Sequence, residues 1–352
     1  MQQQKIMLPP IIFGTSGLGN IYHETTYEKK FSIVKECIND AIGIPMFDSA
    51  GKYGAGMALE VLGKCLKELE VNPDDVVISN KLAWYQVPLE TPEPTFEKGI
   101  WKHLTHDAVQ RISYQGIIDC YQQGNALLGN YNSGMASVHD PDEYLATVNN
   151  KEEEDRLYQD ILEAYRALGE LKAQGKVKSI GVGSKQWKVV ERISKDVKLD
   201  WVMIANSLTL HSHPIELVEF IGELCKKGIS VINSAVFNGG FLTGGDHYNY
   251  RYIDGTTEEG KELFRWRHDF FEICHSFGIL PAEACMHFGF NIAGITSIAI
   301  STTNQYKVRN NINMLKKQIP AHYWETLVSK GLMEEEMLQY TLKKSKNEEL
   351  LN

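Results

Sequence analysis

Short apolar runs rich in β-branched residues alternate with longer amphipathic stretches along the whole chain. This alternation is typical of parallel strands that are joined by helical crossovers. The sequence predicts eight strands, at Ile11–Phe13, Ile44–Phe47, Val76–Asn80, Met135–Val138, Ser179–Val182, Trp201–Ala205, Ile229–Asn233 and Ser297–Ile300. Because the pattern repeats without a change of composition, we expect an α/β fold in which residues 1–352 form one (β/α)8 TIM-barrel domain.

The segments between these strands have the apolar spacing of helices. They are Tyr27–Ala41, Met57–Leu69, Asp107–Leu127, Glu153–Ala173, Trp187–Ser194, Ile215–Lys227, Glu259–Phe277 and Gln305–Lys317.

An open doubly wound sheet is the alternative, and it would normally carry a G-x-G-x-x-G turn after an early strand. Residues 14–19 and 181–186 come nearest to that motif, but the glycine spacing of the first is reversed and the second lacks the third small residue. Two loop-like segments, Tyr85–Trp101 and Phe241–Thr257, are candidate substrate lids.

Composition narrows the class of protein and its partners. The chain is 43% hydrophobic and 23% charged, as expected for a folded enzyme rather than a disordered chain. Its net charge of -9 argues against a nucleic acid or an anionic membrane as partner. The polar start Met1–Lys5 and scattered cysteines without a C-x-x-C pair lead us to expect a cytoplasmic protein with reduced thiols. We expect a monomer or homodimer with a small-molecule substrate.

Four residues with catalytic side chains follow three successive predicted strands. Asp48 ends the second strand, and Tyr53 lies in the glycine-rich turn behind it. Lys81 directly follows the third strand and His139 the fourth. Each of them alone is more typical of a turn former, a packed ring or a solvated charge. Their conjunction at the strand ends where barrel enzymes place their active sites favours a catalytic role.

These four side chains suit proton transfer by a tyrosine. A phenol has a pKa of about 10 and is a poor acid at neutral pH unless a nearby cation stabilises its phenolate. Lys81 would supply that cation and Asp48 would orient it. His139 would hydrogen-bond the reacting oxygen, so that Tyr53 can donate or accept its proton.

The segments 47–54, 79–81 and 138–142 resemble those of the aldo-keto reductase family. They read FDSAGKYG, SNK and VHDPD, and the resemblance spans nearly the whole chain. The last segment is similar to the sugar-oxidising branch that includes D-threo-aldose 1-dehydrogenases and L-fucose dehydrogenases. The resemblance implies a (β/α)8 barrel that binds a nicotinamide nucleotide without a Rossmann turn. It also implies that Asp48, Tyr53, Lys81 and His139 are the catalytic four.

The resemblance implies cofactor contacts as well. The run from Asn233 to Gly244 is similar to the family's pyrophosphate loop, and the residues after the eighth strand are similar to its adenosine-phosphate clamp. The implied cofactor residues are Ser184, Asn206, Ser234, Phe237, Gly240, Leu242, Ser301, Thr302, Lys307 and Asn311. The cofactor would be NAD or NADP. The branch favours NAD, whereas Lys307 would suit the 2′-phosphate of NADP.

The interpretation is therefore hydride transfer at C1 of an aldose of the L-fucose or D-threo type, which gives a lactone. Trp84 and Tyr85 are candidate substrate contacts, because an aromatic face can stack on a sugar ring. The alternatives are an NADPH-dependent aldehyde or ketone reductase and a non-catalytic nucleotide-binding subunit. A metal-dependent hydrolase would need ligands beyond His211 and His213, and we expect no metal site.

Overall fold

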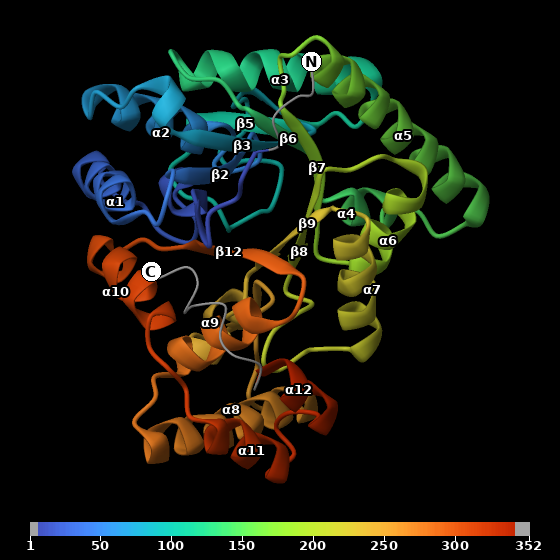
Figure 1. Ribbon diagram of the computed structural model, residues 1–352. Helices are drawn as coiled ribbons and strands as arrows, with labels where there is room; N and C mark the ends of the chain where they lie inside the picture. Colours follow the sequence, from blue (N-terminus) through green and yellow to red (C-terminus); the bar gives the residue numbers. More distant parts are fainter. Residues whose placement is uncertain (1–5, 342–352) are drawn as a thin grey trace. The chain divides into compact units, whose positions relative to one another are not determined.

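The apolar runs form eight parallel strands that close into a barrel, as predicted (Figure 1). The structure is a computed structural model and describes residues 6–341, so both ends of the predicted domain lie outside the described residues. The barrel strands are β1 (Ile11–Gly14), β2 (Met46–Ala50), β3 (Val77–Leu82), β6 (Met135–His139), β7 (Ser179–Ser184), β8 (Trp201–Ala205), β9 (Ser230–Ser234) and β12 (Ile295–Ser301). Their order around the barrel is β1-β12-β9-β8-β7-β6-β3-β2.

Each of the eight predicted helical segments contains a helix. They are α1 (Tyr27–Asp40), α2 (Met57–Glu68), α3 (Tyr114–Leu128), α5 (Lys151–Ala173), α6 (Trp187–Asp196), α7 (Ile215–Lys226), α8 (Glu258–Phe277) and α10 (Gln305–Leu315). Side-chain caps start several of them: the oxygens of Thr26, Ser113, Asn150 and Thr257 accept hydrogen bonds from backbone N–H groups of the first turn. Such caps satisfy N–H groups that would otherwise lack a partner.

One predicted helix begins later than the sequence pattern indicated. Residues His106–Gln110 form strand β5, which pairs antiparallel with β4 (Trp84–Pro88). The helix α3 starts only after Ser113, whose hydroxyl accepts a hydrogen bond from the N–H of Gly116. The expected loop Tyr85–Trp101 therefore begins as one strand of a hairpin, because the backbone groups of β4 find their partners in β5.

Further short elements lie outside the predicted pattern. They are the helices α4 (Pro141–Leu145), α9 (Pro281–Asn291), α11 (Ala321–Ser329) and α12 (Leu338–Thr341), the strands β10 (His247–Tyr248) and β11 (Arg251–Tyr252), and the 3-10 helices η1 (Ser16–Gly19), η2 (Pro73–Asp75), η3 (Asn238–Thr243) and η4 (Glu335–Met337). Proline opens α4 and α9 at a first-turn position where its missing N–H costs nothing.

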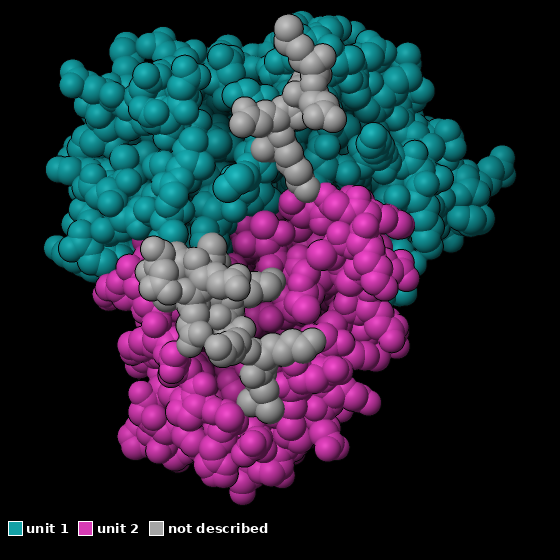
Figure 2. Space-filling view, viewed as in Figure 1, with its two compact units in different colours: residues 1–203, 299–309 teal, residues 204–298, 310–352 magenta. Residues whose placement is uncertain are grey.

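The chain divides into two compact units, which are coloured separately in Figure 2. Unit 1 comprises residues 1–203 and 299–309, and unit 2 comprises residues 204–298 and 310–352. In unit 1 every residue of β2 and β6 is buried, as is typical of parallel strands covered on both faces. Unit 2 has its own apolar core, which includes Phe241, Phe270 and Trp324.

Among residues 6–341, no helix has both the length and the apolar character that crossing a bilayer requires. All six cysteines are free; five of them are buried, and Cys225 is exposed.

Candidate active site

The strand ends that carry the predicted catalytic residues are neighbours in unit 1. β2 pairs with β3, which places Ala50 opposite Lys81, and Asp48 precedes Ala50 in the same strand. β3 pairs with β6, which places Lys81 opposite Ser137, and His139 is the last residue of β6. Asp48, Lys81 and His139 thus lie toward the carboxyl ends of adjacent strands, where barrel enzymes build their active sites.

Tyr53 lies in the tight turn between β2 and α2. Its N–H donates a hydrogen bond of 3.1 Å to the carbonyl oxygen of Ala50. At Gly54 the backbone is left-handed, with φ of 62°, and a Cβ atom there would lie 2.5 Å from the carbonyl oxygen of Gly19. Only glycine allows this close approach, so the packing of the turn fixes the backbone that carries the phenol.

Lys81 links Asp48 to Tyr53. Its ammonium forms an ion pair with Oδ2 of Asp48, and both side chains are buried. The same ammonium nitrogen lies 4.8 Å from the centre of the Tyr53 ring. A cation held beside a phenol favours its ionised form, and the carboxylate keeps the cation in place. The three residues can therefore ease the removal of a proton from Tyr53.

His139 completes the predicted set. Its ring lies 5.7 Å from the Tyr53 ring between centroids, in an edge-on arrangement. Burial lowers the pKa of His139 well below its usual value, and Lys81 and other nearby lysines lower it further, against the opposing effect of Asp140. The imidazole is therefore neutral at pH 7 and can donate one N–H and accept at its other nitrogen. The structure thus brings all four predicted residues together.

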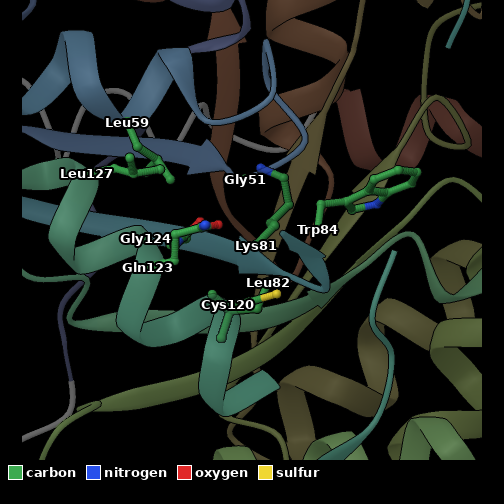
Figure 3. A pocket seen from close by; sticks show the side chains of 10 residues that line it. Gly51, Leu59, Lys81, Leu82, Trp84, Cys120, Gln123, Gly124 and Leu127 are labelled. Carbon is green, nitrogen blue, oxygen red and sulfur yellow. The ribbon is translucent and has the colours of Figure 1, made fainter. Parts of the chain in front are cut away.

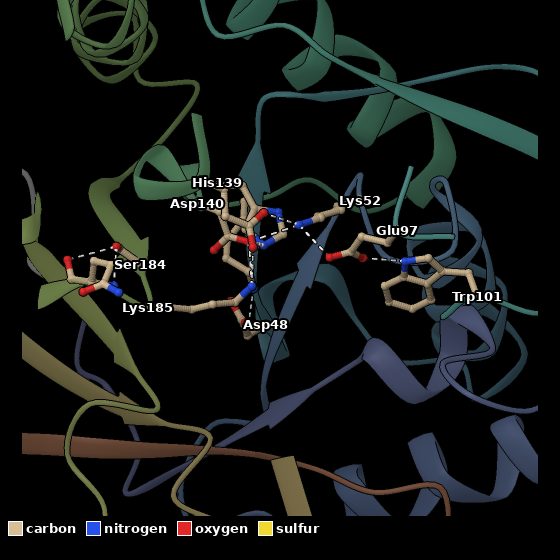
Figure 4. Close-up of polar contacts among 11 residues, drawn as sticks. Asp48, Lys52, Glu97, Trp101, His139, Asp140, Ser184 and Lys185 are labelled. Atoms are coloured by element: carbon tan, nitrogen blue, oxygen red, sulfur yellow. Dashed lines mark hydrogen bonds and ion pairs between the residues drawn. The ribbon is translucent and has the colours of Figure 1, made fainter. Parts of the chain in front are cut away.

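A group of charged side chains adjoins His139, and we call it the Lys52 cluster (Figure 4). Its members are Lys52, Glu97, Asp140, Glu143 and Lys185. The ammonium of Lys52 lies 2.8 Å from Oε1 of Glu97, 3.2 Å from Oδ2 of Asp140 and 2.8 Å from Oε2 of Glu143. Burial alone would lower the pKa of Lys52, but these carboxylates outweigh burial and raise it.

Lys185 holds the other side of this cluster. It forms an ion pair with Glu143 and lies 3.7 Å from Oδ2 of Asp140. Burial would raise the pKa of Asp140, but His139, Lys185 and Lys52 together hold it below its ordinary value. Sequence reasoning missed both lysines. The available signal was their position, because Lys52 directly precedes Tyr53 and Lys185 directly follows β7.

The two predicted substrate residues lie on β4, and their side chains have different neighbours. Trp84 lies on the side of the catalytic residues, with the ammonium of Lys52 5.2 Å from its ring centre. The Tyr85 ring packs against the guanidinium of Arg111 at 4.3 Å. Successive residues of a strand point to opposite faces, which explains the difference. Trp101, which the sequence analysis did not select, packs 5.9 Å from the Tyr53 ring.

A narrow pocket borders Lys81 and Trp84 (Figure 3). It is lined by Gly51, Leu59, Asn80, Lys81, Leu82, Trp84, Cys120, Gln123, Gly124 and Leu127. A Cβ atom at Gly124 would collide with the Asn80 amide, so α3 and β3 approach closely here. Burial raises the pKa of the Cys120 thiol to about 12. The close packing of α3 on β3 therefore supports Lys81, and the Cys120 thiol stays protonated and unreactive.

Four of the predicted cofactor residues belong to unit 1. Ser184 is buried, and its hydroxyl bonds the backbone of Gln186. Ser301 accepts a hydrogen bond from Ser16, at 3.1 Å between the hydroxyl oxygens. Thr302 forms a local turn with Asn304. Lys307 is exposed in the first turn of α10, where the N–H groups of Tyr306 and Lys307 donate to Asn304.

The other predicted cofactor residues belong to unit 2. Asn206 follows β8 with φ of 60°, and its side-chain oxygen is buried without a hydrogen-bond partner among the described residues. This oxygen can accept a hydrogen bond from an amide of a ligand. Ser234 ends β9 and donates to the carbonyl oxygen of Ile204. Asn311 lies nearly buried on α10.

The predicted pyrophosphate loop contains the left-handed residues that a close approach to phosphate requires. Asn238, Gly239 and Gly240 all have positive φ. The N–H groups of Gly240 and Leu242, however, donate to the carbonyl oxygen of Phe237 at 3.0 and 3.1 Å. The Leu242 side chain is fully buried, and Phe237 is half-buried. Both amides must give up these internal hydrogen bonds if they are to hold a phosphate.

The histidine pair considered for a metal has other partners. Nδ1 of His211 lies 2.9 Å from the hydroxyl oxygen of Tyr248, and Nδ1 of His213 lies 3.2 Å from the carbonyl oxygen of Thr209. Across residues 6–341, no three histidine, cysteine or acidic side chains are arranged to hold a metal ion.

Several known proteins are similar to this chain over nearly its whole length. A pyridoxal 4-dehydrogenase from Microbacterium luteolum is 26% identical over 332 residues, which cover 91% of this chain and 93% of that protein. A D-threo-aldose 1-dehydrogenase from Pseudomonas sp is 24% identical over 335 residues, which cover 93% of this chain and 95% of that protein. The structure of a glycerol dehydrogenase from Gluconobacter oxydans superposes with a TM-score of 0.66 at 14% identity and covers 98% of each chain.

These findings confirm the expected fold and the family resemblance. Residues 10–331 match the Aldo/keto reductase family, whose members are oxidoreductases that use nicotinamide cofactors. The chain belongs to the aldo-keto reductase family of oxidoreductases.

Proposed function

We propose that this protein is an NAD(P)-dependent dehydrogenase that oxidises C1 of an aldose to a lactone. The observation that carries the proposal is the position of Lys81, which pairs with Asp48 and lies 4.8 Å from the centre of the Tyr53 ring. The D-threo-aldose 1-dehydrogenase among the relatives supports an aldose as substrate.

In this proposal Tyr53, as phenolate, accepts the proton of the anomeric hydroxyl. Lys81 stabilises the phenolate beforehand, and Asp48 keeps Lys81 in place. Neutral His139 donates an N–H to the anomeric oxygen and orients the sugar. The chemistry that a bound nicotinamide would supply is that of a hydride acceptor for the anomeric carbon. In the opposite direction Tyr53 would return its proton during reduction of a carbonyl.

The proposed cofactor is NAD or NADP. In unit 2, the unpartnered side-chain oxygen of Asn206 suits the carboxamide. In unit 1, Ser301, Thr302 and Lys307 suit the adenosine phosphate.

We expect Lys307→Ala to weaken NADP binding about tenfold and to leave NAD binding unchanged, because only NADP presents a 2′-phosphate to the ammonium. Calorimetric titration with both nucleotides measures this, and equal effects on both would exclude a role for Lys307 in the choice.

The decisive experiment follows reduced nicotinamide by its absorbance while the protein is mixed with NAD or NADP and with L-fucose or D-arabinose. Turnover with an aldose supports the proposal. Absence of turnover with every aldose and aldehyde, in both directions, would exclude the enzymatic function. Tight nucleotide binding without turnover would instead support a non-catalytic subunit, for which the complete set Asp48, Tyr53, Lys81 and His139 has no evident use.

Tyr53→Phe tests the assigned acid and base. The substitution retains the ring and removes only the ionisable hydroxyl, so kcat should fall by roughly 10²- to 10⁴-fold while nucleotide affinity is unchanged. Steady-state kinetics and a nucleotide titration separate the two effects. A fully active Phe variant would mean that another group transfers the proton.

Pyridoxal is a second candidate substrate, because a pyridoxal 4-dehydrogenase is as similar to this chain as the aldose enzyme. Pyridoxal, like an aldose, carries an aldehyde carbon that can close into a cyclic hemiacetal. The same residues would therefore serve its oxidation. The ratio of kcat/KM for pyridoxal to that for each aldose decides between the two substrates.

We further propose a cytoplasmic location and a single domain, acting as a monomer or homodimer. The free cysteines support a reducing compartment. Light scattering after size exclusion measures the oligomeric state.

A further inference from the structure

We propose that Lys52 is a positioning residue that fixes Tyr53 and His139 relative to each other, by tying Asp140 at the end of β6 to Glu97 in the connection between β4 and β5. This inference rests on the proposed function, because it assigns a role in the same reaction. All the residues involved belong to unit 1.

The ammonium of Lys52 is the buried centre of the Lys52 cluster, and we call it the hub. The Lys52 side chain is only 3% exposed, although it follows β2 in a turn. An ammonium has three N–H donors, and three carboxylates, from Glu97, Asp140 and Glu143, lie within 3.2 Å of it. Removing a lysine from water is costly unless each donor finds such a partner. The cluster therefore has one well-defined arrangement, which holds three separate segments of the chain together.

On one side this hub holds the backbone next to His139. Asp140 has φ of 46°, a left-handed conformation that strains a residue other than glycine. Its N–H donates to the carbonyl oxygen of Gly183 at 3.2 Å, and its carboxylate lies 3.2 Å from Lys52. The same carboxylate oxygen lies 3.5 Å from Nε2 of His139. Lys52 thus holds in place the residue that borders the imidazole.

On the other side, Lys52 is linked through Glu97 to Trp101, whose ring packs on Tyr53. Glu97 lies 2.8 Å from Lys52, and its other oxygen accepts a hydrogen bond of 2.7 Å from the indole N–H of Trp101. The Trp101 ring lies 5.9 Å from the Tyr53 ring. Figure 4 shows the chain of contacts from Asp140 through Lys52 and Glu97 to Trp101. Both catalytic rings therefore contact groups that depend on one ammonium.

The experiment compares Lys52→Met with three other variants. Lys185→Met removes the second lysine of the cluster but leaves the contact between Lys52 and Glu97. Glu97→Gln breaks the ion pair with Lys52, and its amide oxygen can still accept from Trp101. Glu97 is partly exposed, so this variant folds even if Lys52→Met does not. Lys64→Met is the matched control, because Lys64 is exposed on α2 outside the cluster.

We expect kcat for Lys52→Met to fall roughly tenfold to a hundredfold, with little change in nucleotide affinity, because small displacements of catalytic groups cost such factors. Glu97→Gln should lower kcat in the same way, and the double variant should lose no more than Lys52→Met alone, because both changes break one connection. Lys185→Met should lower kcat less than Lys52→Met. Losses that multiply in the double variant, or a Lys52→Met enzyme with unchanged kcat, would overturn the proposal.

A second readout does not depend on turnover. The charged groups around His139 are Lys81, Lys52, Lys185 and Asp140, with Asp48, Glu97 and Glu143 as the partners of these lysines. Removing the positive charge of Lys52 should raise the pKa of His139, as measured by NMR titration of the imidazole, and should move the acid limb of kcat/KM to higher pH. A His139 titration that stays in place in Lys52→Met would mean that Lys52 does not act on the imidazole.

The two hypotheses fail separately. If the wild-type protein oxidises no substrate, the proposed function is wrong, and the NMR titration still decides whether Lys52 acts on His139. If the wild-type protein is active and Lys52→Met matches it in kcat and in titration, only the role of Lys52 is wrong.

Discussion

At the scale of residues, the neutral state of His139 makes the stability of the folded protein depend on pH. An unfolded histidine has a pKa of about 6.5, whereas burial lowers the pKa of His139 in the folded protein. Below pH 6.5 the unfolded chain therefore takes up a proton that the folded protein does not. The stabilising contribution of His139 is present above this pH and is lost as the pH falls toward the folded pKa.

We therefore expect the free energy of unfolding to fall by up to about 1.4 kcal/mol per pH unit below pH 6.5 through His139 alone. In His139→Gln this part of the slope should disappear. Urea denaturation at pH 7.5, 6.5 and 5.5 measures the slope, with the exposed His322→Gln as control. Identical slopes for wild type and His139→Gln would show that folding does not lower the pKa of His139.

The sequence predicted the positions of Asp48, Lys81 and His139 because each belongs to a strand end, and strand ends can be read from local apolar patterns. The neighbours of these residues could not be read in this way. Glu97 lies in a connection whose path depends on tertiary packing, and its ion pair with Lys52 spans a long stretch of chain. The contact of Tyr85 with Arg111 was missed for the same reason, because it depends on the hairpin pairing.

At the scale of elements, close approaches between helices set limits that helix propensity does not reveal. Gly63 lies inside α2, and a Cβ atom there would lie 2.9 Å from Cα of Leu128 and still closer to its carbonyl group, at the end of α3. Gly169 lies inside α5, where a Cβ atom would meet nothing within 4 Å. The two glycines therefore have different functions in their helices.

Alanine substitution should affect these two positions in opposite directions. Gly169→Ala should stabilise the protein by about 0.5–1 kcal/mol, because alanine loses less backbone entropy in a helix. Gly63→Ala should destabilise it by about 1–3 kcal/mol, because α2 and α3 must move apart. Denaturant midpoints measure both changes. A stabilised Gly63→Ala would mean that the two helices separate without cost.

All eight barrel strands were predicted from the sequence, since buried parallel strands are nearly continuous apolar runs. The hairpin of β4 and β5 was not, because its half-exposed residues fit a helix as well as a strand until the pairing partner is known. The short α4 was missed because it has too few residues for a helical period to be visible.

At the scale of the whole molecule, the proposal of a single domain predicts one cooperative unfolding transition. Calorimetry should give one endotherm whose van't Hoff and calorimetric enthalpies agree. Nucleotide at a hundred times its Kd should raise the stability by about 2.7 kcal/mol and shift the entire transition. Two separate endotherms, of which only one responds to nucleotide, would contradict the single domain.

The packing of Trp101 on Tyr53 also gives the protein an optical signal of its own. Indole fluorescence responds to the polarity and charge of its surroundings, and this indole lies 5.9 Å from the Tyr53 ring. We therefore expect the emission of Trp101 to change when the charge of the phenol changes or when a ligand arrives beside it. In a variant that keeps Trp101 as its only tryptophan, stopped-flow measurements of this emission can follow ligand arrival without a label.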